Sequence, residues 1–194
     1  MSRVNLESID HNLEGGNMSG IVPQLIYGYL EDVAVWPTEP APTVALGVTT
    51  PLTLAAAGAL VGDVVMKAGT RAFTLDFTED TGLFKINVVG ENDGGHFEYD
   101  LTIIKAKIRK IILGFQNASV DRKMFFIVTD ENSQTYLMGS KTRGCGLQTG
   151  GDGNTTGTTG SDRNQSSLSY KFRTRRALVY EGDTEDLLTL VPVS

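Results

Sequence analysis

Apolar side chains alternate with polar or small ones along much of the middle of the chain. This period of two is present at 64–66, in 73–77 and in 84–88, and it returns in 97–103. Successive side chains of a strand point to opposite faces of a sheet, so the alternation predicts strands that bury one face. Turn sequences such as Asp80-Thr81-Gly82 separate these segments. We therefore expect at least three strands joined by short turns within 52–91, and a further strand at 97–103.

The spacing of apolar residues changes beyond residue 103. Five of them recur at intervals of three and four, as on one face of a helix, namely Ile104, Ile108, Ile111, Ile112 and Phe115. This pattern predicts one amphipathic helix at about 105–117. Gly114 argues against it, because an interior glycine costs about 1 kcal/mol relative to alanine. A strand that continues from Phe97 is the alternative, since it places three basic residues on one face.

The chain contains further segments that resemble strands. Residues 21–30 and the continuous apolar run 124–129 each predict a strand, the second one buried. Another strand is expected at 136–140, after a tight turn. Asn132 suits the left-handed position of that turn. Nearer the C-terminus, 168–180 predicts one long strand and 187–193 an edge strand.

The length and the distribution of apolar residues predict a single domain. The chain has 194 residues, 40% of them hydrophobic, which suits one core. Residues 1–20 are polar and predict a flexible N-terminal arm, so the β-rich domain is expected to span 21–194. Within it, 141–167 is nearly free of apolar residues and predicts a long loop rich in glycine and threonine. No transmembrane helix and no secretory signal are predicted.

Composition limits the chemistry that the chain can perform. With one cysteine and two histidines, His11 and His96, we expect no metal site and no disulfide. Neither histidine lies in a known catalytic motif. The paired carboxylates are Glu79 with Asp80, Glu98 with Asp100, and Glu185 with Asp186, and each pair is expected at the surface. We therefore expect no catalytic residues, no cofactor and no enzyme activity, with a small hydrolase that uses dispersed carboxylates as an alternative.

The glycine-rich loop does not match a nucleotide-binding or calcium-binding motif. Phosphate-binding loops need a lysine directly after the glycines, and none follows them here. Asp152, Asn154 and Asp162 carry oxygen ligands, but they lack the spacing of a calcium loop. We expect a loop that is flexible or ordered by a partner, with a calcium site as the alternative.

Basic residues gather near the end of the long predicted strand. They are Lys171, Arg173, Arg175 and Arg176, interleaved with Tyr170 and Phe172. The pattern is compatible with a nucleic-acid surface. The net charge of -6 favours instead ion pairs with carboxylates of a neighbouring strand or subunit. Trp36 lies in a proline-rich connection and is expected to be a packing anchor, with partner recognition as the alternative.

Two sequence patterns resemble those of a known family. The first runs from Phe126 through Ile127-Val128-Thr129-Asp130-Glu131-Asn132 to Tyr136-Leu137-Met138-Gly139-Ser140, and the second joins Thr158, Gly160 and Asp162-Arg163-Asn164 to a strand. Together with the arm and the helix they resemble virion structural proteins of tailed bacteriophages. The likeness is greatest to tail tube proteins of phages that infect Bacteroidetes-type hosts, over roughly residues 60–182.

This resemblance implies an antiparallel β-sandwich or small barrel flanked by one helix. Subunits of this kind form homo-hexameric rings that stack as a tube, with strands of adjacent subunits paired edge to edge. The N-terminal arm and the glycine-rich loop would become ordered by neighbours. We expect subunit contacts at Trp36, Arg173, Arg175 and Arg176, and an acidic lumen through which DNA passes without specific binding.

The resemblance also implies a location and partners. The protein is expected in the virion after assembly in the host cytoplasm, with copies of itself and other virion proteins as partners and without a membrane. The position within the virion stays open among tube, terminator, head-tail connector and capsid decoration. A β-sandwich module that binds a carbohydrate or a protein through Trp36 or the loop is the main alternative.

Overall fold

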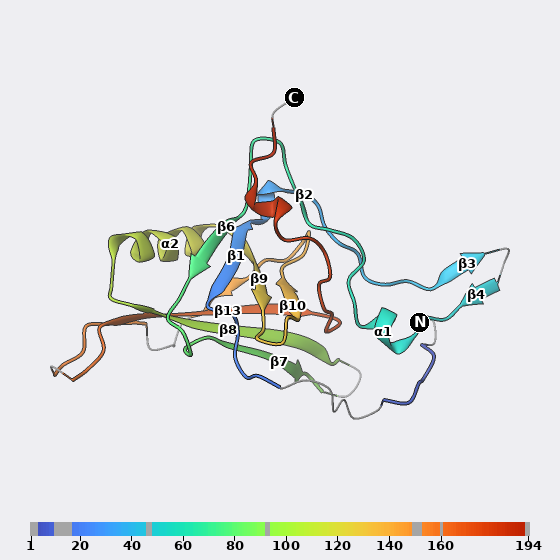
Figure 1. Cartoon of the computed structure of the whole chain (residues 1–194), viewed down its shortest axis with the longest axis horizontal. Coiled ribbons are helices and arrows are strands. Elements are labelled where there is room, and N and C mark those ends of the chain that lie inside the picture. Colours follow the sequence, from blue (N-terminus) through green and yellow to red (C-terminus); the bar gives the residue numbers. More distant parts are fainter. Residues whose placement is uncertain are drawn as a thin grey trace.

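Two antiparallel sheets packed face to face form the main part of the molecule (Figure 1). This arrangement is given by a computed structural model that describes residues 4–9, 17–45, 48–91, 94–148, 153–159 and 161–192. It confirms the expectation of a mainly β protein with antiparallel sheets, and among the described residues neither sheet closes into a barrel. His11 and Asp152 lie outside the described residues.

The first sheet, which we call the central sheet, has four strands in the order β10-β9-β1-β6. Their bounds are Thr135–Met138, Met124–Thr129, Gln24–Tyr29 and Phe73–Asp76. Strand β9 is buried on both faces, because Phe126 and Val128 pack into one apolar cluster while Phe125 and Ile127 pack into another. The continuous apolar run in the sequence therefore reflects a strand covered on both sides.

The second sheet, which we call the long sheet, has the order β11-β13-β8-β7. These strands are Gly146–Leu147, Gln165–Thr174, His96–Ala106 and Leu83–Val89, and the short β12 (Asn154–Thr155) also pairs with β13. Alternation holds along β8, where Tyr99, Leu101 and Ile103 are buried against the central sheet. The residues between them face away from the sandwich.

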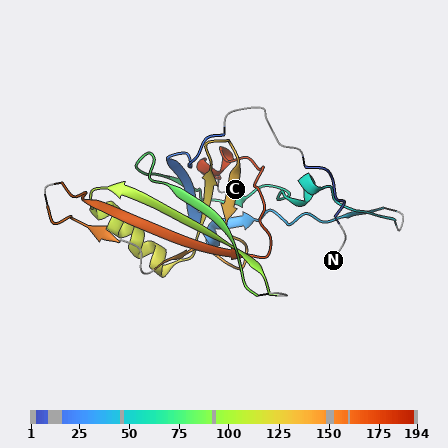
Figure 2. The same ribbon diagram turned by 90° about the horizontal axis from the view of Figure 1, so that it is seen from below.

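Helix α2 (Lys110–Asp121) covers one end of the sandwich (Figure 2). The ring of Phe115 packs edge to face on Tyr27 at 5.0 Å between ring centroids, which joins the helix to the central sheet. Ser119 joins it to the long sheet, because its hydroxyl lies 3.0 Å from the hydroxyl of Tyr170. The helix is thus fixed to both sheets.

A third layer covers the other face of the central sheet. It contains β2 (Val33–Val35), β5 (Val65–Met66) and the 3-10 turn η2 (Asp186–Leu188), and a further 3-10 turn, η1 (Leu30–Asp32), leads from β1 into β2. Tyr180 is buried here, and its hydroxyl accepts a hydrogen bond from the backbone N–H of Val64 at 3.1 Å. The described residues therefore form two apolar clusters, one on each side of the central sheet.

A projection extends from the sandwich on the side opposite to α2 (Figures 1 and 2). It consists of the hairpin β3 (Thr43–Ala45) and β4 (Val48–Thr50), the short helix α1 (Leu54–Ala57) and residues 4–9. The backbone N–H of Asn5 donates to the carbonyl of Leu52 at 2.9 Å. We call residues 4–9 the N-terminal segment. Neither the hairpin nor α1 was expected from the sequence.

The predicted helix at 105–117 is wrong at its start. Strand β8 continues to Ala106, and Lys107 then adopts a positive φ of 66° that ends the strand. The helix begins only at Lys110. The alternative of a strand continuing from Phe97 is therefore correct for the first part of this region.

Three smaller predictions also need correction. The strand expected at 168–180 starts at Gln165 and ends at Thr174, which pairs with Phe97 near the start of β8. Leu187, expected in an edge strand, lies in η2 and is buried in the third layer. In the turn after β9, Ser133 and not Asn132 has the positive φ. Asn132 instead uses its side chain to bind the backbone of Met18.

Candidate functional site

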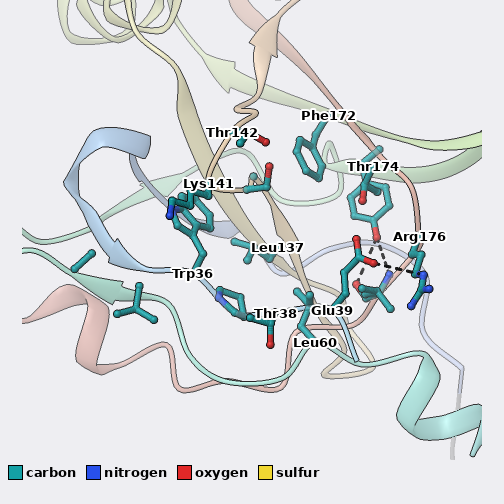
Figure 3. Close-up of a pocket in the computed structure, with 17 residues that line it drawn as sticks. Trp36, Thr38, Glu39, Leu60, Leu137, Lys141, Thr142, Phe172, Thr174 and Arg176 are labelled. Atoms are coloured by element: carbon teal, nitrogen blue, oxygen red, sulfur yellow. Dashed lines mark hydrogen bonds and ion pairs between the residues drawn. The ribbon is translucent and has the colours of Figure 1, made fainter. Parts of the chain in front are cut away.

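A cleft of about 520 Å³ opens beside Trp36 (Figure 3). Its lining residues come from five separate parts of the chain, namely 34–39, Leu60, Tyr99, 137–142 and 172–178. We call it the Trp36 cleft. Its volume falls within the range of roughly 300–1,000 Å³ that is typical of ligand pockets.

Trp36 is held in place by the central sheet. Its indole packs edge to face on Phe125, with 5.8 Å between ring centroids. This close packing depends on Gly139, whose φ is +148°. A Cβ at that position would lie 2.7 Å from Cβ of Phe125 and 3.4 Å from Cη2 of Trp36. The expected packing role of Trp36 is thus observed, and the same residue lines the cleft.

The opposite wall of the cleft is built by the long sheet. Tyr99 and Phe172 stand side by side on β8 and β13, with their ring centroids 5.9 Å apart. The Tyr99 hydroxyl accepts a hydrogen bond from the backbone N–H of Leu178 at 2.9 Å, which fixes the chain after β13. Burial raises the pKa of the Tyr99 hydroxyl above its ordinary value, so the group stays neutral.

The rim of the cleft is charged. Glu39 and Arg176 lie 3.5 Å apart across it, and Lys141 is the third charged residue of the lining (Figure 3). Two cations against one anion give the rim a net positive charge. No histidine is among the described lining residues. The cleft therefore suits a ligand in which an apolar group lies next to an acidic group.

The residues predicted as subunit contacts do not lie together. Trp36 and Arg176 both line the cleft. Arg173 points to the outer face of the long sheet, and Arg175 is exposed in the bend that follows β13. The sequence reasoning did not single out Lys141 or Leu178 as members of a site. Nothing in their local sequence marks them, because their place in the cleft arises from the pairing of distant segments.

A row of ion pairs crosses the outer face of the long sheet. Glu98 is only 5% exposed and receives hydrogen bonds from Nζ of Lys171 at 2.6 Å and from Nε of Arg173 at 2.8 Å. Lys171 also lies 3.3 Å from Asp100, which in turn accepts a hydrogen bond from Asn87. The hydrogen bonds from the two cations lower the pKa of Glu98. For Lys171 and Arg173, pairing with a neighbouring strand is what the structure shows.

The candidates for catalysis and metal binding are spread over the fold. His96 begins β8, and its Nε2 has no hydrogen-bond partner among the described residues. Asp162 accepts hydrogen bonds from Thr158 and Thr159 within its own loop, and those bonds lower its pKa to about 2. In the described parts of the chain, no three His, Cys, Asp or Glu side chains are placed to hold a metal.

None of the described helices is long and apolar enough to cross a membrane.

The two edges of the long sheet differ. Along β13 the edge is covered by β11 and β12, and the backbone N–H of Gln148 adds a bond to Ser169 at 2.8 Å. Along β7 the edge pairs with no other described strand. Ile86 and Val88 of this edge are exposed although they lie on the same face as the buried rings of the sheet. One edge is therefore closed within the chain and the other is open.

Comparison with protein-family models, curated proteins and solved structures finds no significant match to this chain.

Proposed function

We propose that this protein is a structural subunit that assembles with copies of itself into stacked rings, as the tail tube of a bacteriophage does, and that DNA passes through the rings. The observation that carries the proposal is the open β7 edge. The outward-pointing backbone groups of this seven-residue strand have no strand partner among the described residues, and Lys85 is its only charged residue. Natural proteins usually protect such an edge with charges, prolines or a covering segment.

Self-assembly accounts for the exposed apolar residues at this edge. Val88 is 74% exposed, and Leu83, Ile86 and Val89 are also exposed. Pairing with a strand of a second copy satisfies the backbone groups and covers these side chains. In this proposal the partner strand belongs to a different surface of the second copy, since pairing of two β7 edges would give a closed dimer and no ring. Contacts between two different surfaces are head to tail, and they close into a ring when the rotation between subunits permits.

The projection opposite to α2 provides a second surface for contacts. The hairpin β3–β4 stands away from the sandwich and exposes Val44. Extended elements of this kind gain packing partners when a neighbouring subunit covers them. In this proposal the protein has no active site, and its residues act through contacts between subunits. The net charge of -6 is compatible with a lumen wall that does not retain DNA.

Electron microscopy of the purified full chain tests the proposal. We expect negatively stained rings, or tubes built of stacked rings, at high protein concentration, and a weight-average mass in sedimentation that rises with concentration. Monomers at every concentration and salt condition would overturn it.

A second candidate function is a ligand-binding β-sandwich module of a virion, which the Trp36 cleft favours. It predicts a monomer or trimer that binds its ligand without forming rings.

A further inference from the structure

We infer that the Trp36 cleft is the docking site for the N-terminal segment, residues 4–9, of a second copy of this chain. The inference rests on the proposed self-assembly and names one of its contacts. It joins two surfaces that are both incomplete in the single chain. One is a cleft with an apolar interior, and the other is a segment whose apolar side chains lie in solvent.

The N-terminal segment has no apolar partner within the described chain. Leu6 is 83% exposed and Ile9 is 86% exposed, although both belong to the most apolar residue types. Among the described residues, the hydrogen bond from the backbone N–H of Asn5 to the carbonyl of Leu52 is the contact that fixes the segment. Such side chains gain free energy when they leave water, so the segment is suited to bind an apolar surface.

The cleft offers such a surface. Trp36, Phe172 and Leu137 form its apolar interior, and the volume of about 520 Å³ has room for more than one aliphatic side chain. Figure 3 shows the labelled aromatic residues on opposite sides of this space, with Leu137 between them. A Leu or Ile side chain placed there is enclosed on several sides, as in the central anchors of protein interfaces.

The charges of the two surfaces are complementary. Glu7 lies between Leu6 and Ile9, and Asp10 and Glu14 follow in the sequence, against a single cation at Arg3. The rim of the cleft carries Lys141 and Arg176 against Glu39. An acidic segment therefore meets a rim of net positive charge. This complementarity favours the segment as a partner and orients it as it approaches the cleft.

The contact is head to tail, because the segment and the cleft are different surfaces. Each copy can give its segment to one neighbour and accept the segment of another. The same contact can therefore be repeated through a ring or between stacked rings. A variant that lacks one of the two surfaces can still use the other, and this allows each surface to be tested separately.

Trp36 is the only tryptophan of the chain, so its fluorescence reports on the cleft directly. The receptor is the full chain with Leu6→Asp and Ile9→Asp, which cannot donate its own segment. We expect a synthetic peptide of residues 1–9 to shift the emission of Trp36 to shorter wavelength in a saturable way. The control peptide carries the same two substitutions and is expected to bind at least about tenfold more weakly. No shift, or equal binding of both peptides, would overturn the inference.

A charge exchange provides the second test. Glu7→Lys and the pair Lys141→Glu with Arg176→Glu should each lower the affinity between copies in sedimentation by about tenfold or more, and the combined variant should recover most of it. Glu79→Lys, at an exposed turn, is the matched control and should have no effect. Absence of recovery would contradict the contact. If the emission of the unsubstituted chain is blue-shifted relative to that of the Leu6→Asp, Ile9→Asp chain at every concentration, the segment docks within one copy, which also overturns the inference.

The two proposals can fail independently. Peptide binding by a chain that never forms rings would overturn the tail-tube function and keep the docking site. Rings formed by a chain whose Trp36 emission does not respond to assembly or to the peptide would overturn the docking site and keep the function.

Discussion

Arg173 donates a hydrogen bond from its Nε to Oε2 of Glu98 at 2.8 Å, and this contact joins a largely exposed cation to an almost fully buried carboxylate. Lys171 donates to the other oxygen of the same carboxylate. Two cations on one strand thus pair with one buried anion on the next. The long sheet can carry a buried charge here because both carboxylate oxygens are paired.

The pairing of Glu98 makes the stability of the fold depend on pH. Its pKa is lower in the folded protein than its ordinary value of 4.5, so the unfolded chain binds more protons at acid pH. The contribution is complete above the ordinary pKa and is lost as the pH falls through the folded pKa. We expect Glu98→Gln to cost about 1–2 kcal/mol in free energy of unfolding at pH 7, because both cations are partly exposed. The difference should shrink in urea titrations as the pH falls below 4.5, and a difference that stays constant with pH would contradict the prediction.

The hydrogen bond between Ser119 and Tyr170 predicts an asymmetry between two substitutions. The Ser119 hydroxyl donates to the carbonyl of Phe115 at 2.7 Å, so the bond between the two side chains is made by the Tyr170 hydroxyl as donor. Tyr170→Phe removes this bond and should cost about 0.5–1.5 kcal/mol. Ser119→Ala leaves a buried hydroxyl without a partner and should cost about 1–3 kcal/mol. Denaturant unfolding of both variants and of the double variant measures the coupling, and additive costs would show that the residues do not interact.

Two glycines should respond to alanine in opposite directions. Gly139→Ala forces a Cβ into Phe125 at a positive φ and should destabilise the fold by about 2–5 kcal/mol. Gly114 lies within α2, where an added Cβ meets no atom within 4 Å. Gly114→Ala should therefore stabilise by about 0.5–1 kcal/mol. Thermal unfolding checks both, and a stabilised Gly139→Ala would contradict the packing of Trp36 on Phe125.

The strands were predictable where one face of a sheet is buried. Tyr99, Leu101 and Ile103 alternate with polar residues because the central sheet covers only one face of β8. The start of the helix was not predictable from spacing. Ile104 matches the helical spacing by coincidence. It belongs to β8, where it lies on the outer face opposite Ser167. The positive φ of Lys107 separates the strand from the helix. A lysine at this position gives no indication of a positive φ in the sequence.

The cleft was less predictable than the sheets. Trp36 was recognisable as a residue that must pack, but its partners lie about one hundred residues away, at Phe125 and Gly139. Phe172 and Leu137 follow ordinary strand patterns, and only the pairing of strands brings them to the same space.

Short elements were not predicted because they contain too few residues to show a period. Helix α1 has a local signal in the N-cap of Thr53, whose hydroxyl accepts from the N–H of Ala56, but only four residues follow that cap.

The open edge of the long sheet gives the sharpest test of assembly. Val88 on β7 and Val120 on α2 are exposed to nearly the same extent, 74% and 72%. Val88→Lys places a charge at the proposed strand contact, where pairing with a second copy would bury it, and should weaken association at least about tenfold. Val120→Lys adds the same charge to the surface of a helix and should leave association unchanged. Sedimentation velocity over a range of concentrations compares the two variants, with circular dichroism to verify that each is folded. Equal losses in both would show that the added charge itself, and not the β7 edge, controls association.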